Sequence, residues 1–187
     1  MKLLLIDNYD SFTYNIVELL RSLSISNFTL VKNEVSIAEA SGYSKIILSP
    51  GPATPSESGN ILGIIKALGA THSLLGICLG HQAIAQAYGA TLRQLEHPYH
   101  GFQTRLNITE RHKIFDFPHQ SDLVVGLYHS WVVDEQEFPD CLTITSRSHE
   151  NHIMSIRHKT HDVHGVQFHP ESYMTGYGRE MLSAFLS

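Results

Sequence analysis

The chain has 187 residues, of which 42% are hydrophobic and 17% charged, as in an ordinary globular protein. A net charge of −5 without a basic stripe argues against a nucleic-acid-binding protein, and two cysteines cannot make a disulfide framework. The apolar run at 3–6 stops at Asp7 and is too short for a signal peptide or a bilayer span. We therefore expect one domain over residues 1–187, in the cytoplasm and without membrane contact.

The first half of the chain alternates short apolar runs with segments of helical spacing. The predicted strands are 2–6, 28–31, 46–48 and 74–77, and the predicted helices lie around 16–23, 36–40, 60–68 and 82–87. This alternation predicts an α/β fold, an open, mostly parallel, doubly wound sheet with helices on both faces. Such sheets bind ligands at the carboxyl ends of their strands, so Asp7, the loop 49–51 and Cys78 should meet at one edge.

The second half reads as shorter strands, followed by a helix at 177–186. The predicted strands are 91–95, 104–109, 123–127, 142–146, 153–156 and 163–168. They predict a smaller antiparallel extension beside the main sheet.

Cys78 stands between Gly76 and Gly80, where a buried strand turns into a helix. A tight strand-to-helix turn needs small neighbours and lifts the side chain clear of the sheet. The start of the following helix favours a thiolate through its dipole and its unpaired N–H groups. This pattern indicates a nucleophile. Taken alone it also suits a small buried hydrophobic side chain, which is what most free cysteines are.

His169 and Glu171 occupy alternate positions of an extended segment, with Pro170 stiffening the backbone between them. The carboxylate would hold the imidazole in one tautomer and stabilise it once protonated. His169 would then take the thiol proton of Cys78, and the thiolate would attack an acyl carbon. The Leu79 N–H and a second N–H at Gly51 are the expected oxyanion donors, each contributing on the order of 3 kcal/mol.

Several motifs together resemble the class I (triad) glutamine amidotransferases. They are G-I-C-L-G-H-Q at 76–82, S-P-G-P at 49–52 and G-V-Q-F-H-P-E-S at 165–172. D-N-Y-D-S-F-T at 7–13 and Y-H-S-W at 128–131 are similar to the small glutaminase subunits of anthranilate synthase and 4-amino-4-deoxychorismate synthase. The resemblance covers nearly the whole chain.

The resemblance implies a glutaminase in which Cys78, His169 and Glu171 form the triad and Cys78 carries a γ-glutamyl thioester. It places glutamine against Gln82, Ser130, Trp131 and the loop Gly51-Pro52-Ala53. It implies that ammonia passes to a larger chorismate-binding partner subunit. It implies no cofactor in this chain, whereas the partner is expected to use Mg²⁺.

Three residues depart from the usual pattern of this family. Ala53 replaces a frequent glycine, Trp131 a leucine, and Phe102 the lysine that commonly follows a His-Gly pair. None belongs to the triad, so the resemblance still implies catalysis. Coupling to a partner is the property these departures put in question.

Other interpretations remain at this point. One alternative is the glutaminase part of an enzyme that makes GMP or carbamoyl phosphate. Another is a non-catalytic binding subunit. His169 is preferred to His81 as the base, and His129 and Cys141 are expected to be structural. The stretch 8–11 either contacts a partner or caps the first helix. The thirteen histidines show no metal-binding spacing, so no metal site is expected.

Overall fold

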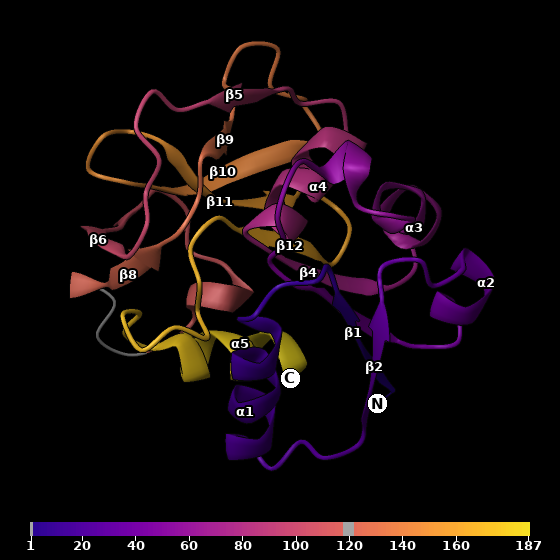
Figure 1. The fold of residues 1–187 in the computed structure, drawn as a ribbon. Helices are drawn as coiled ribbons and strands as arrows, with labels where there is room; N and C mark the ends of the chain where they lie inside the picture. The colour runs from indigo at the N-terminus through magenta and orange to yellow at the C-terminus, as the bar shows by residue number, and fades with distance from the viewer. Residues whose placement is uncertain (1, 118–121) are drawn as a thin grey trace.

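A computed structural model describes residues 2–117 and 122–187 of the chain. Figure 1 shows a central twisted sheet with helices packed on both sides. Its strands, in the spatial order β2-β1-β3-β4-β12-β11-β10-β7, are Phe28–Lys32, Leu3–Asp7, Lys45–Leu48, Ser73–Ile77, Val163–Val166, Ile153–His158, Leu142–Arg147 and Asn107–Ile108. The helices α1 to α5 are Thr13–Ser22, Ile37–Ala40, Ile61–Leu68, Leu79–Ala87 and Gly178–Leu186. The predicted doubly wound α/β sheet is confirmed.

The sheet changes from parallel to antiparallel at β12. Strands β2, β1, β3, β4 and β12 pair in parallel, whereas β11, β10 and β7 continue the sheet as antiparallel neighbours. Two separate antiparallel pairs stand outside this sheet, β5 (Leu92–Gln94) with β9 (Trp131–Val133) and β6 (Phe102–Arg105) with β8 (Val124–Leu127). The predicted antiparallel extension is therefore partly a continuation of the main sheet.

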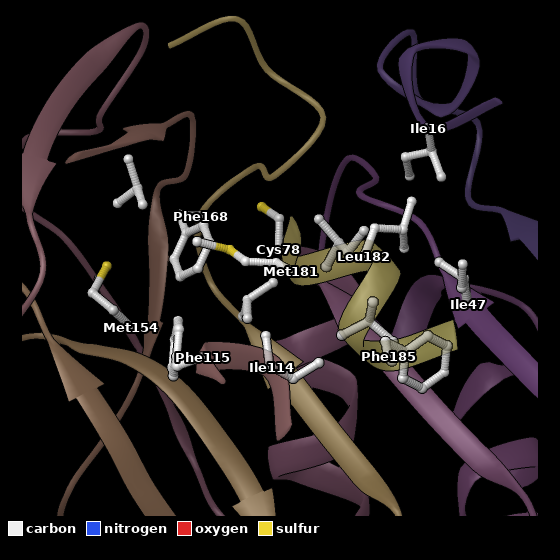
Figure 2. Close-up of a cluster of buried hydrophobic side chains, with 14 of the residues drawn as sticks. Ile16, Ile47, Cys78, Ile114, Phe115, Met154, Phe168, Met181, Leu182 and Phe185 are labelled. Atoms are coloured by element: carbon white, nitrogen blue, oxygen red, sulfur yellow. The ribbon is translucent and has the colours of Figure 1, made fainter. Parts of the chain in front are cut away.

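Alternate residues of the buried strands feed two cores on opposite faces of the sheet. Leu3 and Leu5 of β1 pack with α1 and α5, and this first core also holds Phe115, Phe168 and Cys78 (Figure 2). Leu4 and Ile6 point to the other face, where α3 and α4 pack. Each central strand is thus covered by helices on both sides, which explains its nearly continuous apolar sequence.

Four predicted elements differ from the structure. The helix expected around 16–23 begins earlier, at Thr13. The expected strand 163–168 ends at Val166 and joins the parallel half of the sheet, beside β4. The expected strand 104–109 breaks at Leu106, because β6 pairs with β8 while β7 pairs with β10. The helix expected at Gln82 begins earlier, at Leu79. Strand β9 and two 3₁₀ turns, Pro55–Glu57 and Lys113–Phe115, were not predicted.

No helix formed by the described residues is long and apolar enough to cross a membrane.

Candidate active site

Four neighbouring parallel strands end at the same edge of the sheet, the edge at which open α/β sheets bind their ligands. Asp7 ends β1, Ser49 follows β3 and Cys78 follows β4. Strand β12 ends level with β4, since Val166 pairs with Ile77 and the Cys78 N–H donates to the Val166 carbonyl at 2.8 Å. This fourth strand, placed by the sequence among the antiparallel ones, carries His169 to the cysteine.

Cys78 adopts a strained backbone conformation between β4 and α4. Its φ is 52° and its ψ is −99°, a region that side chains other than glycine rarely occupy. Strain of this kind costs on the order of 1–3 kcal/mol and persists only where the surroundings enforce it. Cys78 is also the N-cap residue of α4, so the unpaired N–H groups of the first turn lie beside its sulfur. The predicted tight strand-to-helix turn at Cys78 is present.

The two glycines around Cys78 are required by close backbone packing. A Cβ on Gly76 would lie 2.3 Å from the carbonyl group of Gly80, and a Cβ on Gly80 would lie 2.5 Å from the Leu48 carbonyl oxygen. Backbone atoms cannot move aside as a flexible side chain does. The G-x-C-x-G pattern therefore holds α4 directly against the ends of β3 and β4.

His169 and Glu171 form a buried pair. The His169 Nδ1 and the Glu171 Oε1 are 2.7 Å apart, and the side chains are 2% and 0% exposed. Burial by itself lowers the pKa of His169, but Glu171 and Cys78 oppose it and raise that pKa well above its ordinary value. The imidazole is therefore the group that accepts a proton in this site. Its second nitrogen, Nε2, is buried and makes no hydrogen bond to the described residues.

Two aromatic rings pack against the His169 imidazole. Phe12 and Tyr128 each form an edge-to-face contact with it, with ring centroids 4.9 Å apart. Tyr128 is itself fixed by a 2.9 Å hydrogen bond between its hydroxyl and that of Ser172. Phe12 comes from the stretch 7–13. This stretch therefore helps to position the base, a role that the sequence did not reveal.

A cavity of about 560 Å³ opens above Cys78. Its volume suits a small-molecule ligand. It is lined by residues expected to bind glutamine, namely Gly51, Pro52, Ala53, Gln82, Ser130 and Trp131. Further lining residues that the sequence did not assign to the pocket are Tyr9, Asp10, Ser11, His100 and Tyr128. Leu79 is not part of the lining, because its side chain is buried below the loop at Gly51.

The loop after β3 lies directly on the nucleophile turn. A Cβ on Gly51 would lie 2.5 Å from Leu79 Cδ2 and 2.6 Å from Asn8 Cβ, so only glycine permits this approach. Asn8 fastens the loop by donating from Nδ2 to the Ser49 carbonyl at 2.8 Å. Gly51 therefore packs directly against the Leu79 side chain. Asn8 is buried and structural.

The stretch 8–11 combines packing and surface roles. Asp7, not residues 8–11, carries the main anchor, since its carboxylate accepts from the Tyr9 N–H at 2.8 Å and the Thr13 hydroxyl at 2.9 Å. The N-cap of α1 is Phe12, without a side-chain capping bond. Tyr9 is 55% exposed at the mouth of the cavity.

The remaining candidates lie as follows. His81 is fully buried in α4, and its burial lowers its pKa to about 4, so it does not act as the base. His129 lines the cavity, is 4% exposed, and has no hydrogen-bond partner for either ring nitrogen among the described residues. Cys141 packs at the edge of the second core. In the described part of the chain, no three His, Cys, Asp or Glu side chains are grouped to hold a metal ion.

The family model described as glutamine amidotransferase class-I matches residues 4–187. The chain belongs to this family. The anthranilate synthase component 2 of Pseudomonas aeruginosa is 40% identical, over 98% of this chain and 94% of its own length. The aminodeoxychorismate synthase component 2 of Klebsiella aerogenes is 39% identical, over 99% of each chain.

The fold of this amidotransferase is also found in a solved structure. A Thermoplasma acidophilum protein described as belonging to a GMP synthase superposes with a TM-score of 0.87 at 28% identity, covering 100% of this chain and 92% of that one. A protein described as a GMP synthase subunit thus shares the scaffold, although the two curated relatives above are closer in sequence.

Proposed function

We propose that this amidotransferase hydrolyses L-glutamine at Cys78 and delivers the ammonia to a larger subunit that aminates chorismate. The observation that carries the proposal is the buried His169–Glu171 pair, 2.7 Å apart, beside a strained cysteine at the floor of a cavity. A protein that only binds a ligand would need neither the strained backbone at Cys78 nor the buried His169–Glu171 pair.

His169 takes the proton of the Cys78 thiol, and the raised pKa of His169 favours the imidazolium that results. The thiolate sulfur attacks the side-chain carbonyl carbon of glutamine and forms a tetrahedral adduct. His169 then gives its proton to the leaving nitrogen, and ammonia departs from a γ-glutamyl thioester. A water molecule, deprotonated by His169, attacks the thioester carbon. Glutamate leaves and Cys78 recovers its proton.

The tetrahedral adduct carries a negative oxygen that needs hydrogen-bond donors. The Leu79 N–H is in the first turn of α4, where a helix supplies no internal acceptor. Gly51, on the loop after β3, packs against the Leu79 side chain and offers the second N–H. We assign the oxyanion hole to these two groups.

The partner assignment rests on the relatives. Both curated relatives described above are named as component 2 of a synthase, one for anthranilate and one for aminodeoxychorismate. Their nearly equal identity to this chain supports chorismate as the acceptor in either case. We propose that this chain works in the cytoplasm without a cofactor of its own and that Mg²⁺ is bound by the partner.

The test is to purify the tagged chain with its partner from its own cells and to supply chorismate with glutamine or with ammonium chloride. Wild type should aminate chorismate from both nitrogen sources, and the mass and fluorescence of the product distinguish anthranilate from aminodeoxychorismate. Cys78→Ser should lose the glutamine-dependent reaction and keep the ammonia-dependent one. Cys141→Ser is the matched control and should keep both. Loss of both reactions in Cys78→Ser, or no chorismate product from the wild-type complex, would contradict the proposal.

A further inference from the structure

A chain of hydrogen bonds connects the floor of the cavity to the cysteine. The Gln82 Nε2 donates to the Trp131 carbonyl at 2.8 Å and to the Gln167 Oε1 at 3.1 Å. The Gln167 Nε2 in turn lies 3.6 Å from the Cys78 sulfur, as a donor. Gln167 is 0% exposed and has no role in the mechanism described so far.

The direction of this hydrogen-bond chain is set by a backbone group. The Trp131 carbonyl only accepts hydrogen bonds, so Gln82 must present its NH₂ group to it. The second hydrogen of the same NH₂ group then faces Gln167, which must offer its oxygen. The Gln167 NH₂ group is consequently turned toward Cys78. Neither of the two side-chain amides is free to rotate by 180° without breaking a bond.

We propose that Gln167 is a positioning residue that aims a fixed N–H at the Cys78 sulfur and so favours its reactive thiolate form. This inference rests on the proposed role of Cys78 as the nucleophile. Hydrogen bonds to charged acceptors are stronger than those to neutral ones, so the donor stabilises the thiolate more than the thiol. Gln167 and His169 stand two residues apart after β12, so the donor to the sulfur and the proposed base come from the same strand end.

The burial of Gln167 indicates that its amide group does more than fill space. An amide buried without partners is destabilising, and an aliphatic side chain would fill the same space without that penalty. Here the oxygen is satisfied by Gln82, and the NH₂ group has the sulfur as its acceptor. The structure thus uses a polar residue where packing alone would favour an apolar one.

The same hydrogen bonds determine what Gln82 offers to a ligand. Both hydrogens of its NH₂ group are occupied by Trp131 and Gln167, so only its Oε1 remains available in the cavity. Gln82 therefore accepts a hydrogen bond from the ligand, and glutamine offers two matching donors, its ammonium group and its side-chain NH₂ group. Gln167 therefore links ligand binding at Gln82 to the N–H that points at the Cys78 sulfur.

The experiment measures alkylation of Cys78 by iodoacetamide as a function of pH, with the Cys78 peptide quantified by mass spectrometry to separate it from Cys141. Gln167→Met keeps the length of the side chain and loses the donor. Gln167→Glu keeps the shape and replaces the NH₂ group by an oxygen. Gln103→Met is the matched control, since Gln103 donates only to the Met174 carbonyl on an exposed strand.

We expect alkylation at neutral pH to slow roughly 10- to 100-fold in both Gln167 variants, with the midpoint of the pH profile moved upward. Gln103→Met should follow wild type. If Gln167→Met does not fold, Gln167→Leu, which also lacks a donor and adds no charge, carries the test. Wild-type profiles in the folded Gln167 variants would overturn the inference. A strong Gln167 effect in a chain that releases no ammonia from glutamine would support it and refute the proposed function instead.

Discussion

The buried histidine of α4 makes the stability of this protein sensitive to acid. Burial lowers the pKa of His81 to about 4, from an ordinary value of 6.5, despite a contact with the Gly165 backbone. Between these pH values the unfolded chain binds a proton that the folded chain does not. The free energy of unfolding therefore rises with pH in this window, by about 1.4 kcal/mol per pH unit. From pH 6.5 down to pH 5, His81 alone removes about 2 kcal/mol.

The perturbation that isolates this effect is His81→Leu, measured by urea denaturation at several pH values from 5 to 7.5. Leucine has a similar size and does not titrate, so the variant should lose about 2 kcal/mol less than wild type between pH 6.5 and 5. His112 and His129, whose pKa values burial also lowers to about 3, act in the same direction and remain in both proteins. Taking the difference between variant and wild type removes their contribution.

The matched control is His97→Leu, because His97 is exposed on the loop after β5. This control should follow the wild-type profile. The reasoning is refuted if His81→Leu keeps the full acid sensitivity of wild type while remaining folded at pH 7. It is equally refuted if His97→Leu flattens the profile as much as His81→Leu does.

Two further predictions concern the nucleophile turn and the base. Glu171→Gln keeps the shape but removes the charge that orients His169, so glutaminase kcat should fall on the order of 10²- to 10⁴-fold in an ammonia-release assay; a kcat within a few-fold of wild type would show that Glu171 does not orient the base. Gly80→Ala places a Cβ 2.5 Å from the Leu48 carbonyl oxygen and should reduce the free energy of unfolding by about 1–3 kcal/mol or more in urea denaturation. Gly63→Ala is its control, since its nearest neighbour, Ile37 Cδ1, is 3.5 Å away and helix propensity should make it stabilising by about 0.5–1 kcal/mol; equal effects of the two alanines would contradict the packing argument.

The parallel strands β1, β3 and β4 were predictable because each is buried on both faces and forms a short apolar run. Strand β12 is the informative exception. Its sequence, Val163-His164-Gly165-Val166, has only two apolar positions, and nothing local indicates which strand it will join. Its pairing with β4 joins residues far apart in the sequence, and the Gly165 backbone is needed there because the His81 Nδ1 would lie 2.8 Å from a Cβ. The local periodicity of a sequence carries no information on contacts between residues so far apart.

The candidate site likewise contains features that the sequence predicts and residues that it does not. The turn at Cys78 and the contact between His169 and Glu171 were predictable, because one lies between glycines and the other follows from alternation along an extended segment. Gln167 was not, because its partners Gln82 and Cys78 lie on α4 and at the end of β4. A glutamine within an apolar strand end shows only that a polar group must be satisfied somewhere. The structure is needed to identify the acceptor.

The way the site is built separates a rigid part from a variable part. Cys78 and His169 follow adjacent strands that are hydrogen-bonded to each other, so the sheet itself sets the distance between nucleophile and base. The outer wall of the cavity consists of loops, which include Tyr9, Ala53 and His100. A partner that docks on this edge would therefore reshape the entrance without moving the two reacting groups. Hydrogen bonds through Gln82 and Gln167 connect the Trp131 carbonyl, on the cavity wall, to the Cys78 sulfur. A movement of the Trp131 backbone would therefore reach the sulfur along these bonds.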